Sequence, residues 1–289
     1  MQVVMARASG FCGDDGRFGV SGAIKLAQEA ALSRPDEVYI VGDLVHNTHV
    51  TEWLRRDYGI KFVSKLSDVP DGKVLVIKAH GATPDFLAQA AAKKLTVVDA
   101  TCPMVAGAQT LVRTLSAQGK KIVYVASDKK HDEARSVSAQ AKGVKVVTLE
   151  QLDELEIKRP AETVVLTQTT LSMLETADKF ARLQARYPDL EIRAHLCRAT
   201  TDRQQAVLDL AADVDFLLVV GAPHSSNSRR LLEVAATTGL PAKAVDEVSE
   251  IDERWFGAGI FRVGVIAGAS TPEWITAAVV AKIESWKNA

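Results

Sequence analysis

The chain has 289 residues, of which 47% are apolar and 25% charged, and its formal net charge is −1. This length is enough to bury a large core, and the near-zero net charge argues against nucleic acid or an anionic membrane as a partner. Its apolar runs are shorter than the roughly 20 residues that span a bilayer, and its first residues lack the features of a signal peptide. We therefore expect a cytoplasmic protein without a membrane partner.

Apolar runs of strand length alternate with helical patterns along the whole chain. The first unit predicts strands at 3–6, 37–41, 60–63 and 73–78, and helices at 21–32, 50–58 and from 84. The second predicts strands at 95–99, 120–126, 143–147 and 163–167, and helices at 104–118, from 131, at 151–155 and at 173–187. The third predicts strands at 215–221, 241–245 and 262–268, and helices at 201–212, up to 238 and from 272. This alternation indicates an α/β fold of mostly parallel sheets with right-handed crossovers.

Three cysteines, Cys12, Cys102 and Cys197, are almost evenly spaced, and each follows a short apolar run and precedes a helical pattern. The simplest arrangement with this spacing is three similar α/β lobes placed pseudo-threefold around a central site. We predict lobes at 12–101, 102–196 and 197–289, with an N-terminal strand in 1–11 leading into the centre. An odd cysteine count fits a reducing compartment better than a disulfide framework.

Three thiolates that meet at one point would suit zinc or an iron–sulfur cluster, with one position left open. Structural zinc usually comes with close CxxC pairs, which this sequence lacks. Iron–sulfur clusters normally take four cysteines, so three would leave one iron able to act as a Lewis acid. Three unrelated buried thiols are the alternative, because free cysteine is often buried.

Polar residues recur in the loops that follow predicted strands, where open parallel sheets bind ligands. These loops contain His46, His80, His131 with Glu133, Thr169, His224 with Ser225, Ser226 and Asn227, and Ser270. The SSNS segment would cradle phosphate oxygens at a helix start, or would only cap that helix. Glu133 would be an acid in the anion pocket that takes part in proton transfer, or a surface residue of a charged helix start. The sequence has no Walker loop or GxGxxG fingerprint, which disfavours ATP and NAD.

The motifs GFC, VHN, AHG, DATCP, HxE, TQTTLS, ATTxRQ, SSNS and AGAS occur in this order over almost the whole chain. In this the sequence resembles the LytB/IspH family, the 4-hydroxy-3-methylbut-2-enyl diphosphate reductases of the methylerythritol phosphate route to isoprenoids. The resemblance implies a [4Fe–4S] cluster held by Cys12, Cys102 and Cys197, whose open iron binds the substrate's allylic hydroxyl. Electrons would come singly from a ferredoxin or flavodoxin, and the products would be isopentenyl and dimethylallyl diphosphate.

The resemblance also implies roles for the strand-end residues. Glu133 would relay the proton that lets hydroxide leave as water, and Thr169 would orient the substrate hydroxyl. The diphosphate would be held by His46, His80, Ser225, Ser226, Asn227 and Ser270, with His131 beside it.

Several positions depart from the family pattern. The loop after Cys12 is longer and adds Asp14, Asp15 and Arg17, and Gly22, Arg198 and Asp202 replace the usual residues. Charge next to a cluster ligand alters the reduction potential of the cluster, the access of solvent to it or the docking of an electron donor. The chain could therefore be a divergent relative that acts on another substrate. A non-catalytic iron–sulfur sensor and a zinc-stabilised binding protein are further alternatives.

Overall fold

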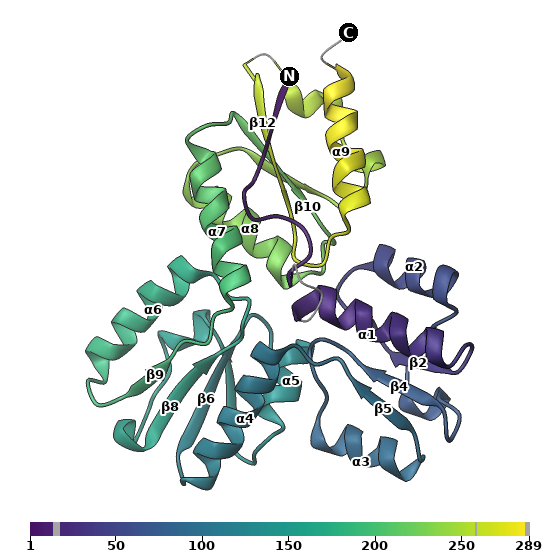
Figure 1. The fold of residues 1–289 in the computed structure, drawn as a ribbon. Coiled ribbons are helices and arrows are strands. Elements are labelled where there is room, and N and C mark those ends of the chain that lie inside the picture. Colours follow the sequence, from purple (N-terminus) through teal and green to yellow (C-terminus); the bar gives the residue numbers. More distant parts are fainter. Residues whose placement is uncertain (14–17, 258, 287–289) are drawn as a thin grey trace. The chain divides into compact units, whose positions relative to one another are not determined.

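The structure, a computed structural model, describes residues 1–13, 18–257 and 259–286. Its framework is three parallel four-stranded sheets flanked by helices (Figure 1). The predicted α/β class with three similar sheets is thus confirmed. By its contacts the chain divides into two compact units, residues 1–12, 46–50 and 198–289, and residues 13–45 and 51–197. The second unit contains two of the sheets and the first unit contains one.

One sheet of the second unit has the strand order β3-β2-β4-β5. Its elements are α1 (Gly19–Ser33), β2 (Val38–Val41), α2 (Thr48–Tyr58), β3 (Lys61–Val63), β4 (Val74–Ile77), α3 (Pro84–Ala92) and β5 (Thr96–Asp99), α2 beginning in the first unit. Tyr39 and Leu75 pack with Ala90 of α3 in one apolar cluster. Helix α3 begins at Pro84 because Thr83 accepts the Phe86 N–H on its Oγ1, at 3.2 Å.

The other sheet of the second unit has the order β7-β6-β8-β9. Its elements are α4 (Pro103–Ala117), β6 (Lys121–Ala126), α5 (Asp132–Ser138), β7 (Lys145–Thr148), β8 (Thr163–Thr167), α6 (Met173–Arg186) and β9 (Glu191–Arg193). Alternate residues of β6 face opposite sides, as the pleat requires. Val123 and Val125 pack on the side of α6, whereas Tyr124 packs on the side of α4 and α5.

The sheet of the first unit has the order β1-β12-β10-β11. Its elements are β1 (Gln2–Met5), α7 (Arg198–Ala211), β10 (Phe216–Val220), α8 (Ser226–Thr237), β11 (Ala242–Val245), β12 (Arg262–Ala267) and α9 (Glu273–Ser285). Helices α7 and α8 cover one face, where they pack on Leu217 and Val219, and α9 covers the other, where it packs on Leu218 (Figure 1).

The sheet to which β1 belongs differs from the prediction, in which this strand is the first element of the first predicted unit. Strand β1 pairs in parallel with β12, Val3 opposite Val263 and Met5 opposite Val265, and so completes the sheet formed by the last strands. The pairing joins residues that are far apart in the sequence, and no local pattern indicates it. This arrangement anchors the segment that leads to Cys12.

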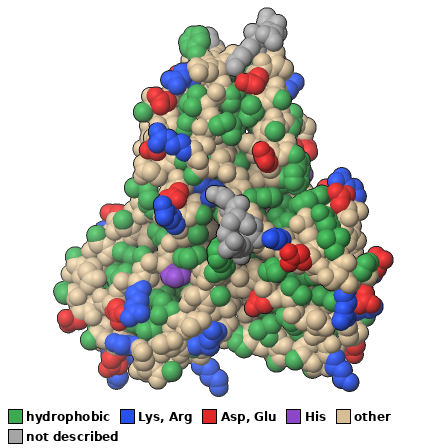
Figure 2. Space-filling view, viewed as in Figure 1, with side chains coloured by type: hydrophobic (Ala, Val, Ile, Leu, Met, Phe, Trp, Pro, Cys, Tyr) green, Lys and Arg blue, Asp and Glu red, His purple; other side chains and the backbone are tan. Residues whose placement is uncertain are grey.

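The remaining predicted elements occur within a few residues of their expected bounds, except that a 3-10 turn at Glu150–Leu152 replaces the short helix expected at 151–155. Further 3-10 turns lie at Leu66–Asp68, Pro160–Glu162, Val248–Glu250 and Glu253–Phe256. Among the described residues, no helix has the length and apolar character needed to cross a bilayer. On the face drawn in Figure 2, acidic and basic side chains are interspersed.

Candidate functional site

The three cysteines are of intermediate exposure and form no disulfide with any described residue, and each is anchored through its backbone at the end of a strand. In the first unit, the Cys12 N–H donates to the Ala269 carbonyl after β12, at 3.2 Å. In the second unit, the Cys102 N–H donates to Ala79 O and the Cys197 N–H to Thr169 O, both at 2.9 Å. Each thiol therefore belongs to a strand-end loop, as the sequence predicts.

Two cysteine segments of the second unit are also tied to each other. His195, two residues before Cys197, has its Nε2 3.0 Å from the carbonyl of Met104, two residues after Cys102. The His195 N–H donates to Thr167 Oγ1 at 2.7 Å, which fixes the ring-bearing segment to the end of β8. No pattern in the sequence indicated this role of His195.

Glu133 is a buried carboxyl group with three donors. Its side chain is 1% exposed, so the alternative of a surface residue is wrong. Oε1 accepts from the Thr169 N–H at 2.8 Å and from the Tyr124 hydroxyl at 3.0 Å, and Oε2 accepts from Thr169 Oγ1 at 2.8 Å. Because Thr169 O also accepts the Cys197 N–H, the carboxyl group is connected to a cysteine through a single residue.

Burial sets the protonation behaviour of this group. Burial raises the pKa of Glu133 above its ordinary value of 4.5, although the donors from Thr169 and Tyr124 oppose the shift. Burial also raises the pKa of Tyr124 well above its ordinary value, and the charge of Glu133 acts in the same direction. The pair therefore retains protons to higher pH than exposed groups would, which suits a proton donor.

The raised pKa of Glu133 predicts how the free energy of unfolding depends on pH. A carboxyl group whose pKa is higher when folded favours folding most at low pH, and this contribution is lost as pH rises above 4.5 and through the folded pKa. Glu133→Gln removes this titration and keeps the shape, so its stability relative to wild type should increase with pH. Each unit of raised pKa corresponds to about 1.4 kcal/mol. Thermal unfolding of both proteins from pH 5 to 8 checks this, and parallel curves would contradict it.

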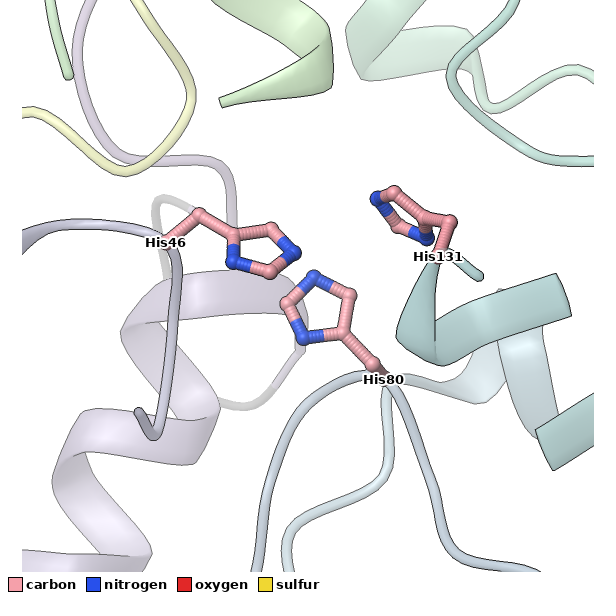
Figure 3. Close-up of side chains that lie close together, drawn as sticks. All are labelled: His46, His80 and His131. Carbon is pink, nitrogen blue, oxygen red and sulfur yellow. The ribbon is translucent and has the colours of Figure 1, made fainter. Parts of the chain in front are cut away.

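His80 and His131 lie close together in the second unit (Figure 3), with ring centroids 5.5 Å apart and planes at 81°. His131 caps α5, since its Nδ1 accepts the Glu133 N–H at 3.2 Å, and the neutral ring then carries its proton on Nε2. The His80 carbonyl accepts from Ser136 Oγ at 2.6 Å. Gly81 follows with φ of +77°, and a Cβ there would lie 2.5 Å from Gln109 Nε2, so the AHG turn requires glycine.

The SSNS segment of the first unit is buried and polar. Ser225 caps α8 by accepting the Ser228 N–H at 3.4 Å, so the capping interpretation is confirmed. It does not account for Asn227, which is 5% exposed and whose side-chain oxygen and nitrogen have no hydrogen-bond partner among the described residues. A buried amide without a partner is costly, which makes Asn227 a candidate for binding a polar ligand.

The loops that follow β10 and β12 approach the SSNS segment closely, and the loop after β12 also contacts the segment of His46. A Cβ on Gly221 or on Gly268 would lie 2.4 Å from Ser228 Oγ, so glycine is needed for this close approach. Ser270 Oγ donates to the His46 carbonyl at 3.1 Å, and the rings of His46 and His224 meet edge to face at 5.9 Å (the His46 ring is also drawn in Figure 3). His224 thus contacts His46, one of the residues predicted to bind an anion.

Of the departures noted above, Arg198 and Asp202 face each other on α7, with Nε and Oδ2 3.4 Å apart and both side chains largely exposed. An exposed pair of this kind contributes little to stability. Gly22 is buried in α1. Asp14, Asp15 and Arg17 lie outside the described residues.

Three parallel sheets, strand-end cysteines and a buried carboxyl group held by a threonine and a tyrosine define the class of this α/β protein. Comparison with known proteins gives the family. The model of the LytB protein family matches residues 3–284, so the chain belongs to that family.

Curated relatives carry one common name. A 4-hydroxy-3-methylbut-2-enyl diphosphate reductase of Neisseria gonorrhoeae is 38% identical, over 98% of this chain and 87% of its own. The protein of the same name from Mannheimia succiniciproducens is 35% identical, over 98% of this chain and 90% of its own.

Solved structures agree with this relationship. The E-1-hydroxy-2-methyl-but-2-enyl-4-diphosphate reductase of Plasmodium falciparum matches with a TM-score of 0.89 and 30% identity, over 97% of this chain and 87% of that one. A structure of (E)-4-hydroxy-3-methyl-but-2-enyl diphosphate reductase, titled as the terminal enzyme of the non-mevalonate pathway, matches with a TM-score of 0.68 and 29% identity. That match covers 99% of this chain and 100% of the other.

Proposed function

We propose that the protein reduces 4-hydroxy-3-methylbut-2-enyl diphosphate by removing its allylic hydroxyl, and that it forms isopentenyl and dimethylallyl diphosphate in the methylerythritol phosphate pathway. Membership of the LytB family and the common name of the relatives support this reaction. The observation that carries the proposal is the buried carboxyl group of Glu133, held by Thr169 and one residue removed from the backbone of Cys197.

The residues present fit an iron–sulfur cofactor. Three cysteine sulfurs provide a soft donor set, and the backbone of each is fixed at a strand end. We infer that Cys12, Cys102 and Cys197 hold a [4Fe–4S] cluster that keeps one iron without a protein ligand. When bound, such a cluster supplies electrons, received from a ferredoxin or flavodoxin, and a Lewis-acid position for an oxygen ligand. Free thiolate ligands require a reducing compartment such as the cytoplasm.

The proposal retains the predicted lobes at 12–101, 102–196 and 197–289, pseudo-threefold around the cofactor. In support, strands β2 to β5, β6 to β9 and β10 to β12 each fall within one of these ranges. The additional strand β1 comes from 1–11.

Glu133 and Thr169 would supply the proton for the departing oxygen. With its pKa raised by burial, Glu133 keeps its proton to higher pH than an exposed carboxyl group would. The Thr169 hydroxyl, 2.8 Å from Oε2, can accept that proton while it donates its own to the substrate hydroxyl. Hydroxide would thus leave as water.

The diphosphate would be bound by His46, His80, Ser225, Ser226, Asn227 and Ser270, with His131 beside it. The amide of Asn227 supports this role, because its buried polar atoms lack partners among the described residues. The start of α8 offers N–H groups and a positive helix end to the same anion.

The decisive experiment is turnover of the named substrate by anaerobically reconstituted protein, with reduced viologen as the electron source. We expect conversion to the two five-carbon diphosphates. A reducible cluster without turnover would favour a sensor, or a relative that acts on another substrate. Protein that binds zinc and lacks iron and sulfide would exclude the reductase.

Tyr124 provides a test of the acid itself. Its hydroxyl stabilises the carboxylate form of Glu133, so Tyr124→Phe should raise the pKa of Glu133 further. The loss of turnover at high pH should then move to higher pH with KM unchanged, at a cost of about 1 kcal/mol in stability for the lost hydrogen bond. The pH dependence of kcat for both proteins measures this. A shift to lower pH would contradict the assignment of Glu133 as the donor.

A further inference from the structure

A separate cleft lies in the second unit, at the carboxyl edge of the sheet β3-β2-β4-β5. It has a volume of about 380 Å³, which is within the range of small-molecule sites. Its floor is formed where β2 and β4 end, by Val41, Gly42, Ile77 and Lys78. The chain leaves β2 towards β3 and leaves β4 towards β5, on opposite sides, so this is the switch point at which open α/β sheets bind ligands.

The charges around the cleft favour an anion. Lys65, Lys78 and Arg135 line it, against a single acid, Asp132. Lys78 Nζ is 2.5 Å from Asp132 Oδ2, so this acid is already engaged. Lys65 and Arg135 are exposed and form no ion pair with any residue that the structure describes. Two cations of the cleft are thus left for a ligand with about two negative charges.

The other walls of the cleft are apolar or weakly polar. Leu66, Val76 and Phe86 supply apolar surface, and Thr83, the cap of α3, contributes the first turn of that helix. Positive side chains beside apolar walls match a molecule with an anionic head and a hydrocarbon arm. We propose that this cleft binds a phosphate or diphosphate ester with a short apolar chain.

This site is distinct from the proposed diphosphate residues, none of which lines it, but it adjoins one of them. Gly81 and Ser136 line the cleft, and Ser136 Oγ holds the carbonyl of His80. The cleft therefore lies directly behind the turn that carries His80. Binding there does not depend on the proposed reaction.

Calorimetry with geranyl diphosphate as probe tests the proposal on oxidised, cluster-loaded protein that carries Asn227→Ala, a change that weakens the proposed catalytic diphosphate site and lies outside the cleft. We expect one equivalent of probe to bind. Lys65→Gln with Arg135→Gln should weaken binding at least about tenfold, because each substitution removes a charge-assisted contact. Both side chains are exposed, so the fold should be unaffected, and Lys65→Arg with Arg135→Lys should retain binding.

Lys25→Gln, an exposed change on α1, is the matched control and should bind as wild type does. Inorganic diphosphate should bind at least about tenfold more weakly than the probe, since it buries no hydrocarbon. Loss of probe binding in the Asn227→Ala protein, or unchanged binding by the double glutamine variant, would overturn the proposal. If the chain has no reductase activity, the probe still binds, so failure of this proposal and failure of the proposed function are separable.

Discussion

Glu133→Gln is expected to lower kcat by about 10²- to 10⁴-fold, the usual contribution of a positioned proton donor. The amide keeps the size of the carboxyl group and can still accept from the Thr169 N–H and the Tyr124 hydroxyl, so the local structure should persist. The amide cannot titrate, so the variant loses the carboxyl group whose pKa is raised by burial. Turnover with reduced viologen, followed by product analysis, measures the loss.

The control for this experiment is Glu154→Gln, which changes an exposed carboxyl group of the same sheet region and should leave kcat within about twofold, as surface changes usually do. The absorption spectrum of the bound cluster should be the same in the wild type, Glu133→Gln and Glu154→Gln. Near-normal turnover by Glu133→Gln with an intact spectrum would rule out Glu133 as the proton donor. The same variant should be more stable at high pH, because removing a raised-pKa group relieves the cost of ionising it when buried.

Cys102→Ser is expected to have the second large effect, on the cofactor itself. Groups that only hydrogen-bond to metal ligands already contribute about 10- to 100-fold to metal affinity, so loss of a thiolate ligand should cost at least about 100-fold. We expect iron and sulfide contents to fall sharply and turnover to become undetectable. Cys12→Ser and Cys197→Ser should behave alike, since each thiol is proposed to hold one iron.

Far-UV circular dichroism separates loss of cofactor from loss of fold in these variants. Cys102 sits at the start of α4 and makes no side-chain capping bond, so serine should be tolerated there. A full complement of iron and sulfide in Cys102→Ser would contradict the three-cysteine proposal. A folded protein without iron would support it.

The parts of the fold that depend on local pattern were predictable from sequence. Apolar strands alternating with helical segments indicated parallel sheets. The apolar positions of each segment follow the face that it buries, so this pattern can be seen in the sequence. The pairing of β1 with β12 was not predictable, since it joins the two ends of the sequence and depends on which sheet has an open edge. The turn at Glu150–Leu152 was misread because a few helical residues do not distinguish an α-helix from a 3-10 turn.

The candidate site was predictable to a similar degree. Residues in loops after strands could be selected because such loops share one edge of a sheet. Whether Glu133 is buried depends on the packing of α5 against β6, which no short motif encodes. Tyr124 was missed because it lies in an apolar strand and has the pattern of a core residue. The available signal was its hydroxyl, which needs a hydrogen-bond partner when it is buried among valines.

The pairing of β1 with β12 has a consequence for biosynthesis. Strand β1 is synthesised long before its partner β12. The backbone bonds from Gly10 to Ala267 and from Cys12 to Ala269 also await residues of β12 and the loop after it. Strand β1 therefore lacks its partner strand until β12 has been synthesised, and loading of the proposed cofactor on three cysteines would have to follow that step.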